Sequence, residues 1–372
     1  MMSRISPRLP LLFAPNLACG RARMVRSVHS LLILALALVP FAGCAQTTSP
    51  AATQSPALST QSPTTTVTVG KLRLQVSVVA RNLDTVWALS WDPDGRLWYT
   101  ERPGRLTRLG DRPQTIAGVV ERGEAGLMGL EIDRQGRIFL MYTASDENRI
   151  ARLGANGSQT VLVNGIRAAS NHDGGRLRFG PDGMLYATTG DAMNGDLARP
   201  DSGSLNGRIL RVDPNSGDVA VVSTGHRNSQ GLCFAPDGRL FSTEHGPALG
   251  DEINIITQGS DGGWPEITGN GIWNYTPTIA PGGCTFYTAD LIPQWKGSLL
   301  FVTLKDSNLH RLTFNADGSV ARDEVLFNDE FGRLRDVRVG PDGAVYLATS
   351  SRDGRGNPGP DDDRILKLTP AS

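Results

Sequence analysis

Residues 171–191 of the 372-residue chain read NHDGGRLRFGPDGMLYATTGD. The middle of this stretch predicts two short strands, Arg176 to Phe179 and Met184 to Thr188, folded about a Pro-Asp-Gly turn. Proline presets φ, aspartate bonds its own backbone, and glycine takes the positive φ that a tight turn needs. His172 and Asp191 then lie at the end of the hairpin away from the turn. A histidine on a loop held by a rigid hairpin is a candidate base, and a hydrogen-bonded structural histidine is the alternative.

The same turn recurs along the rest of the chain at spacings of about 40 to 60 residues, the period of a four-stranded propeller blade. The six copies are Pro93-Asp94-Gly95, Arg134-Gln135-Gly136, Pro181-Asp182-Gly183, Pro236-Asp237-Gly238, Lys296-Gly297 and Pro341-Asp342-Gly343. A second mark, a short strand of the type Arg-Leu-Thr-Arg-Leu, follows each turn. Its copies are Arg105–Leu109, Arg149–Leu153, Arg208–Val212, Glu252–Ile256, Leu309–Leu312 and Arg364–Leu368. Two marks in the same order in every copy indicate six blades.

The sixth copy ends almost at the C-terminus, so its blade lacks an outer strand. Leu72 to Val79 alternate like a strand before the first repeat, and they can supply that strand and close the ring. Helical periodicity is absent, and the 43 Gly and 23 Pro fit an all-β chain with many turns. The sequence therefore predicts an all-β, six-bladed β-propeller of four-stranded antiparallel blades over residues 69–372, closed by an N-terminal strand.

The N-terminal residues predict a targeting signal rather than a folded element. Basic residues precede the apolar run Leu31 to Phe41, which is too short to span a bilayer. The run leads into Phe41-Ala42-Gly43-Cys44, which is similar to a bacterial lipoprotein cleavage box, with ordinary cleavage nearby as the alternative. We therefore expect a signal peptide at 1–43, with Met24 as an alternative start. We also expect an extracytoplasmic protein whose only membrane attachment is a lipid at Cys44.

Amino-acid composition indicates a tether, the classes of partner that are excluded and the state of the cysteines. Residues 45–66 contain only Ala, Gln, Thr, Ser, Pro and Leu, so we expect a disordered tether over 44–68. Lys and Arg number 37, as do Asp and Glu, and no run of basic residues stands out, which argues against nucleic acid as a partner. Beyond the signal, the cysteines are Cys44, Cys233 and Cys284, with no CxxC pair. Cys233 lies in an apolar strand pattern and is expected to be a buried core thiol.

The repeat places several polar residues at one rim, because residues just before the first strand or just after the second lie opposite the turn. These residues are Glu124, His172, Arg227, His245, Lys305, Arg333 and Arg335. Innermost strands line the axis of a propeller, so we expect these side chains to converge on one cup. Four of them are cations, which favours a ligand with several carboxylates; a surface ion pair is the alternative for any single one. The Gly246-Pro247 carbonyls and the Asp251-Glu252 carboxylates are hard oxygen ligands suited to Ca²⁺.

Five motifs carry a wider resemblance: Asn171–Leu177, Gly225–Leu232, Glu244–Pro247, Asp251–Asn254 and Gly332–Asp336. Together they resemble the glucose/sorbosone dehydrogenase family, the soluble PQQ-dependent aldose sugar dehydrogenases. The resemblance covers about Val86 to Leu368 and implies an oxidoreductase that oxidises an aldose sugar at C1 to the lactone. It implies PQQ and Ca²⁺ as cofactors and an external electron acceptor as partner. We expect a monomer or a dimer.

Carried over motif by motif, the resemblance implies roles for the rim residues. His172 is the implied general base for the anomeric hydroxyl, with hydride passing from C1 of the sugar to C5 of PQQ. Arg227 and Asn228 are the implied donors to the quinone oxygens. The implied grips on the PQQ carboxylates are Lys305, Arg333 and Arg335. The implied ligands of Ca²⁺ are the carbonyls of Gly246 and Pro247, with Glu252 at a second calcium site.

Departures from the family pattern bear on specificity. Glu124 stands where soluble glucose dehydrogenase has a Gln near PQQ, so it is counted among the cofactor contacts, and Ala192 stands where that enzyme has another Gln. Residues 260–265, SDGGWP, replace a family Asn-Tyr-Gly-Trp-Pro run near the second calcium site. Two other functions remain alternatives: a lactonase-type hydrolase with a metal on the axis, and a non-catalytic propeller that presents a binding rim.

Overall fold

The computed structural model of the chain describes residues 64–371. The expected signal peptide (1–43), the alternative start at Met24, the lipid attachment at Cys44 and the expected tether up to residue 63 lie outside the described residues. Residues 64–68, which were expected to end the tether, instead belong to strand β1 (Thr64–Val69). The cause of this difference is composition, since TTTVTV consists of β-branched residues that favour strands. In the part of the chain that is described, no helix is long and apolar enough to cross a membrane.

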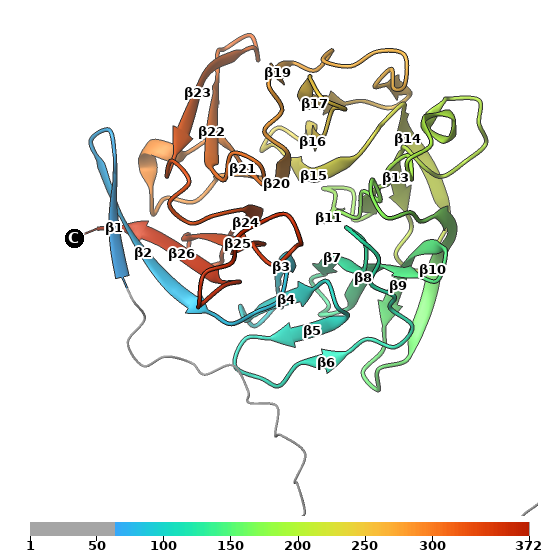
Figure 1. Cartoon of the computed structure of the whole chain (residues 1–372), viewed down its shortest axis with the longest axis horizontal. Coiled ribbons are helices and arrows are strands. Elements are labelled where there is room, and N and C mark those ends of the chain that lie inside the picture. Colours follow the sequence, from blue (N-terminus) through green and yellow to red (C-terminus); the bar gives the residue numbers. More distant parts are fainter. Residues whose placement is uncertain (1–63, 372) are drawn as a thin grey trace, which may run out of the picture. The chain divides into compact units, whose positions relative to one another are not determined.

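The described residues form six sheets around one axis, which confirms the predicted six-bladed β-propeller (Figure 1). The first two blades are β3 (Val86–Trp91), β4 (Leu97–Glu101), β5 (Arg105–Arg108) and β6 (Gln114–Thr115), then β7 (Leu127–Ile132), β8 (Ile138–Ala144), β9 (Glu147–Leu153) and β10 (Gln159–Arg167). The third is β11 (Leu177–Phe179), β12 (Leu185–Thr188), β13 (Ile209–Val212) and β14 (Val219–Thr224), with β18 (Ser260–Asp261) added at its edge. The fourth is β15 (Ser229–Phe234), β16 (Leu240–Glu244), β17 (Asp251–Ile256) and β19 (Trp273–Tyr275). The fifth is β20 (Pro281–Phe286), β21 (Leu299–Thr303), β22 (Leu309–Phe314) and β23 (Val320–Leu326).

The sixth blade takes strands from both ends of the chain. Its sheet runs β24 (Leu334–Val339), β25 (Val345–Thr349), β26 (Ile365–Pro370), β2 (Leu72–Ala80) and β1. β2 pairs antiparallel with β26, with Val76 opposite Leu368. The outer strand that the last repeat lacks is therefore supplied from before the first repeat.

The inner hairpins have the geometry that their turns predict. In the third blade Leu177 lies opposite Ala187, and Phe179 lies opposite Leu185. Gly183 adopts a φ of 75°, a conformation that a residue with a side chain rarely takes. The Asp182 carboxylate accepts a hydrogen bond from the Met184 amide at 3.2 Å, which tightens the same turn. Because the turns all lie at one rim, the segments that enter β11, β15 and β24 lie at the other.

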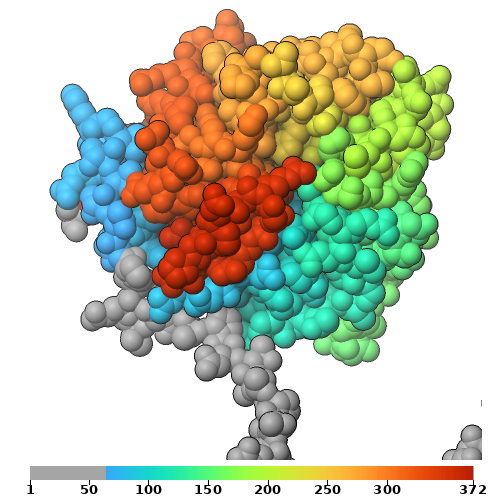
Figure 2. Space-filling model, in the orientation of Figure 1, coloured from blue at the N-terminus to red at the C-terminus, as the bar shows by residue number. Residues whose placement is uncertain are grey.

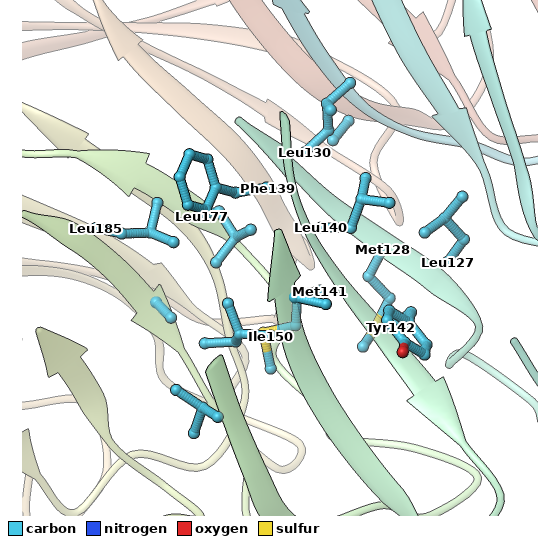
Figure 3. Close-up of a cluster of buried hydrophobic side chains, with 14 of the residues drawn as sticks. Leu127, Met128, Leu130, Phe139, Leu140, Met141, Tyr142, Ile150, Leu177 and Leu185 are labelled. Atoms are coloured by element: carbon cyan, nitrogen blue, oxygen red, sulfur yellow. The ribbon is translucent and has the colours of Figure 1, made fainter. Parts of the chain in front are cut away.

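Apolar side chains between neighbouring blades form the core. In the cluster of Figure 3, Met128 and Leu140 of the second blade pack with Leu177 and Leu185 of the third. These side chains are fully or almost fully buried, and β7 and β8 are buried along nearly their whole length, as expected for sheets that are covered on both faces. The core therefore fixes how one blade sits against the next, and with it the relative positions of the loops at the rim.

A disulfide joins two neighbouring blades. Cys233 on β15 bonds to Cys284 on β20, with Cα atoms 5.8 Å apart. The expectation that Cys233 is a buried core thiol was therefore wrong in its chemistry, although the residue is buried. The sequence pattern showed Cys233 in an apolar strand, but it could not show that two innermost strands place Cys233 and Cys284 face to face.

Candidate active site

The rim opposite the Pro-Asp-Gly turns gathers most of the predicted side chains. A cavity of about 50 Å³ is lined there by Glu124, Gln230, His245, Arg333 and Arg335, together with Arg102, Asp353 and Arg355. A second hollow of about 10 Å³ is lined by Arg227, His245, Gly246, Glu252 and Trp264. His245 borders both hollows, so they adjoin. We call the two together the cup.

His172 is held by a carboxylate and a strained backbone. Its φ is 64°, in the left-handed region that residues with side chains seldom adopt. Its Nδ1 lies 2.9 Å from Oδ1 of Asp191, and about a fifth of its side chain is exposed while Asp191 is buried. With Nδ1 carrying the proton toward that carboxylate, Nε2 is the nitrogen with a free lone pair. The arrangement suits a general base, and strain at such a position is common at functional sites.

Arg227 lines the cup, and its neighbour Asn228 is buried beside it in the segment before β15. The Arg227 guanidinium donates to the carbonyl of Gly246 at 2.8 Å and to that of His245 at 3.1 Å. The Asn228 side-chain oxygen accepts from the Gly174 amide at 3.2 Å. Two donors, Arg227 Nε and Asn228 Nδ2, are buried without a hydrogen-bond partner among the described residues. Burial also lowers the pKa of the Arg227 guanidinium. Buried donors without partners are costly, so this pair indicates a place for an acceptor-rich ligand.

Arg333 and Arg335 share one carboxylate, that of Asp353. Oδ2 of Asp353 accepts from Nη2 of Arg333 at 2.7 Å and from Nη2 of Arg335 at 3.3 Å. Burial would raise the pKa of Asp353, but Arg335 and Arg333 lower it below its ordinary value. Burial lowers the pKa of Arg335 to about 10. The guanidinium of Arg335 also donates to Oε1 of Gln230 at 3.1 Å and lies 5.9 Å from the Trp87 ring.

Glu124 lines the cup, whereas Lys305 lines neither hollow and follows Leu304, which does. Lys305 is exposed, and its Nζ donates to the Thr278 hydroxyl at 2.7 Å. The Glu124 carboxylate pairs with Arg355 at 2.6 Å, and Arg355 also donates to Oδ1 of Asn171 at 3.0 Å. Arg355 therefore reaches from the β25–β26 loop to segments of two other blades. Figure 2 shows this C-terminal part of the chain, in dark red, lying across the middle of the face.

The expected calcium ligands do not form a ready-made cation site. The Gly246 carbonyl accepts from Arg227, and Pro247 is exposed. The Glu252 carboxylate accepts from the backbone amide of Gly269 and from Nδ2 of Asn254 at 3.1 Å. Burial and then the neighbouring Glu244 raise the pKa of Glu252. Over residues 64–371, no three His, Cys, Asp or Glu side chains are grouped so that they could hold a metal ion.

The other histidines differ in chemistry from His172. His245 donates through Nε2 to the Pro281 carbonyl at 3.1 Å, and burial lowers its pKa to about 3, so it stays neutral. His226 is buried, with its two ring nitrogens 2.8 Å from Glu244 and 2.8 Å from the Ser223 hydroxyl. With both nitrogens engaged in the interior, His226 is structural.

A larger cavity, about 560 Å³, lies at the opposite rim among the hairpin turns. Pro181, Pro236 and Gln135 line it, and its buried carboxylate, Asp133, is already paired with Arg137. None of the predicted site residues borders this cavity. The larger of these cavities therefore lies away from the predicted site residues, and we place the candidate site in the smaller cup.

Sequence reasoning missed Asp353, Gln230, Trp87 and the contact of Trp264 with Asp191. Asp353 lies in the long loop between β25 and β26, outside the repeated marks that located the other rim residues. Gln230 was present in a quoted motif without a role. Trp264 was noted only as part of a variant loop, yet its indole N–H donates to Oδ2 of Asp191 at 2.9 Å.

Comparison with known proteins identifies the family of this chain. The family model for glucose/sorbosone dehydrogenase matches residues 83–356. Among solved structures, the chain is similar to a Thermus thermophilus oxidoreductase described as a glucose dehydrogenase, with 38% identity, a TM-score of 0.72 and coverage of 79% of this chain and 99% of the other. It is similar to the PQQ-bound aldose sugar dehydrogenase of Streptomyces coelicolor, with 32% identity, a TM-score of 0.71 and coverage of 80% and 98%. It is also 29% identical over 358 residues to the aldose sugar dehydrogenase YliI of Escherichia coli K12, covering 80% of this chain and 93% of the relative. The chain therefore belongs to the glucose/sorbosone dehydrogenase family.

Proposed function

We propose that this protein is a PQQ-dependent sugar dehydrogenase that oxidises aldoses at C1. Membership of the family supports the reaction class, and the PQQ-bound relative supports the cofactor. The observation that carries the proposal to this chain is the pair of buried donors without partners, Arg227 Nε and Asn228 Nδ2. Both residues lie close to His172 through Asp191. The Asp191 amide donates to the backbone carbonyl of Arg227 at 2.8 Å, and the Asp191 carboxylate contacts Nδ1 of His172.

The donor set fits PQQ. A quinone with several carboxylates offers many acceptors and few donors, so it can satisfy both buried donors and pair with Arg333, Arg335 and Lys305. When bound, PQQ would supply the acceptor for the hydride that leaves the sugar. The cup as it stands is smaller than a site for a ligand of that size, which needs roughly 300 Å³ or more. Entry therefore requires side chains at its mouth, Arg355 above all, to move aside.

The chain's own residues then divide the acid–base work. Nε2 of His172 accepts the proton of the anomeric hydroxyl while Asp191 holds Nδ1–H and stabilises the imidazolium that forms. The sugar loses that proton and a hydride from C1, and its C1–O bond becomes the carbonyl of the lactone. Arg227 and Asn228 stabilise negative charge that develops opposite them during the transfer. Arg333, Arg335 and Lys305 provide orientation through fixed positive charge.

We further propose that Ca²⁺ binds together with the cofactor rather than before it. The carbonyls of Gly246 and Pro247 supply two of the six to eight oxygen ligands that calcium takes. The carbonyl oxygen of Gly246 has a second lone pair beside the one that Arg227 uses. Oxygens of the cofactor and water would complete the set. We propose Glu252 for a second calcium ion, with its carboxylate as the charged ligand.

The N-terminal residues support a proposal about the cellular location of the protein and about its electron acceptor. The signal-like residues 1–43 and Cys44 favour an extracytoplasmic protein held by a lipid. The electrons would then pass to an external acceptor in that compartment.

One experiment tests the proposed function. Apo-protein receives PQQ and Ca²⁺, then a panel of aldoses and an artificial dye, and bleaching of the dye is followed. We expect bleaching that depends on PQQ and on the sugar. No bleaching with any aldose would contradict the proposal. Acid release from lactones without PQQ would favour the lactonase-type alternative, and PQQ binding without turnover would favour the binding propeller.

A further inference from the structure

Trp264 belongs to the fourth blade in sequence but is anchored to the third. It lies in the connection from β17 to β19, where β18 pairs with β14. The Gly262 amide donates to the Thr224 carbonyl at 2.9 Å, and the Trp264 amide donates to the Gly225 carbonyl at 3.0 Å. The backbone that carries the indole is therefore fixed on the blade that also carries His172 and Asp191.

The two oxygens of the Asp191 carboxylate have different partners. Oδ1 lies 2.9 Å from Nδ1 of His172 and accepts from the Met193 amide at 2.8 Å. Oδ2 accepts from Nε1 of Trp264 at 2.9 Å, and Trp264 is its one hydrogen-bond partner among residues 64–371. Asp191 is 1% exposed, so water has little access to replace a lost partner. The rotation of the carboxylate is therefore set by His172 on one side and by the indole on the other.

We propose that Trp264 is a positioning residue for His172: its indole N–H fixes the Asp191 carboxylate, and the carboxylate fixes which nitrogen of His172 carries the proton. The inference rests on the proposed function for the role of His172 as base. Which ring nitrogen of a histidine is protonated depends on the hydrogen bond that the other nitrogen makes. Without the indole N–H, Oδ2 of Asp191 has no hydrogen-bond donor, so the carboxylate can rotate toward another one. The Nδ1–H tautomer of His172 is then no longer favoured. Nε2 is then protonated in part of the molecules and cannot accept the proton of the sugar.

The Trp264 ring has a second contact, which the test must keep. The guanidinium carbon of Arg227 lies 5.4 Å from the ring centroid. Trp264→Phe removes the N–H and retains an aromatic face for Arg227. The chain offers a matched control at the opposite rim, where Nε1 of Trp98 donates to Oδ2 of Asp92 at 2.9 Å. Trp98→Phe removes the same kind of bond from a hairpin turn that does not contact the cup.

The main readout does not depend on turnover. Apo-protein labelled with ¹⁵N-histidine is examined by NMR, with the His172 signals assigned through their loss in His172→Gln. We expect the Nδ1–H tautomer in the natural protein and in Trp98→Phe. In Trp264→Phe we expect the share of the Nε2–H tautomer to rise at least about twofold. In the loaded enzyme, kcat should fall about tenfold, a part of the 100- to 10,000-fold that a positioned base contributes, with KM changed less than kcat.

The outcomes separate this inference from the proposed function. If the natural protein oxidises no aldose, the proposed function fails, and the tautomer comparison still decides whether Trp264 positions His172. An unchanged tautomer in folded Trp264→Phe overturns the inference, as does a loss of kcat of the same size in Trp98→Phe. If near-ultraviolet circular dichroism shows that the Phe variant does not fold, Trp264→Tyr gives the same comparison, because it also lacks the indole N–H and keeps an aromatic face for Arg227. Trp264→His, which restores a ring N–H, should recover the tautomer in part, and a further loss there would also count against the inference.

Discussion

Asp353→Asn tests whether the paired cations of the cup depend on one buried carboxylate. Oδ2 of Asp353 accepts two hydrogen bonds from Arg333, at 2.7 and 3.0 Å, and one from Arg335 at 3.3 Å. The Asp353 side chain is 3% exposed, and that of Arg335 is 5% exposed. The substitution keeps the shape and removes the charge, so two neighbouring guanidinium groups are left without their shared counter-charge. The repulsion between them then acts on the folded state of the apo-protein.

The expected loss of stability follows from this burial. Removing one partner of a buried ion pair costs about 3–5 kcal/mol. For a folded unit of about 300 residues, with an unfolding entropy of about 2.1 cal/mol/K per residue, that loss lowers the Tm by about 5–8 °C. Asp237→Asn is the matched control, because Asp237 pairs with Arg239 at 2.8 Å while both side chains are largely exposed. An exposed pair is worth about 0–1 kcal/mol, so the control should shift the Tm by at most about 1–2 °C.

The pH dependence gives a second check with a defined sign. Burial opposes ionisation of Asp353, but Arg335 and Arg333 outweigh it and hold the pKa of the folded state below the ordinary value. A carboxylate with a lowered folded-state pKa contributes stability that is complete above its unfolded pKa, near about 3.9, and lost as the pH falls through the folded value. The gap in Tm between natural protein and Asp353→Asn should therefore be full at neutral pH and shrink below about pH 4. A gap no larger than that of Asp237→Asn, or one that widens in acid, would refute the reasoning; differential scanning calorimetry of apo-protein across this range measures it.

Three further predictions concern the loaded enzyme. His172→Ala should lower kcat by about 100- to 10,000-fold, because the base is lost, while the Kd for PQQ measured by titration changes little; lost binding would instead mark His172 as a packing residue. Arg333→Ala should weaken PQQ binding by about 10- to 100-fold through loss of a charged contact and should slow turnover less at saturating PQQ; the reverse order in titration and steady-state assays would contradict its role as a grip. Arg355→Ala removes the bridge to Glu124 and Asn171 and should speed PQQ uptake in stopped-flow mixing, whereas an unchanged rate would show that Arg355 does not restrict entry.

The fold could be predicted because each blade repeats the same local chemistry. The hairpin turn is specified largely by its own residues, which are Pro-Asp-Gly in four of the six copies, and the period of these turns along the chain counts the blades. The closing strand was predictable from a count, since the last repeat lacked its fourth strand. The start of the propeller was placed five residues late, because Thr64 to Thr68 were grouped by composition with a polar tether. Whether β-branched residues form a strand there depends on an edge to pair with, and β2 provides one.

The positions of the site residues were predictable only where the repeat fixed their place relative to a hairpin turn. Arg227, Arg333 and Arg335 could be placed at one rim because each precedes the aspartate of a turn by seven to ten residues. Asp353 could not be placed, since the loop that carries it has no counterpart in the other blades. The contact of Trp264 with Asp191 depends on β18 joining a neighbouring blade, which no local pattern shows. The disulfide was missed for the same reason, as it depends on the packing of two blades.

The carboxylate of Asp353, shared by Arg333 and Arg335, also affects how these two cations can bind a ligand. The sequence alone predicts free charges that wait for an anion, but unpaired guanidinium groups so deeply buried would be costly to hold in place. A guanidinium has five N–H donors in a fixed fork. Arg335 uses one each on Ser350, Gln230 and Asp353, and Arg333 uses two on Asp353 and one on the Leu304 carbonyl. Each therefore retains two donors in the described structure, the number that a ligand carboxylate needs for a bidentate contact. Asp353 can then remain bound when a ligand arrives, so it acts as a permanent counter-charge that orients both forks in advance.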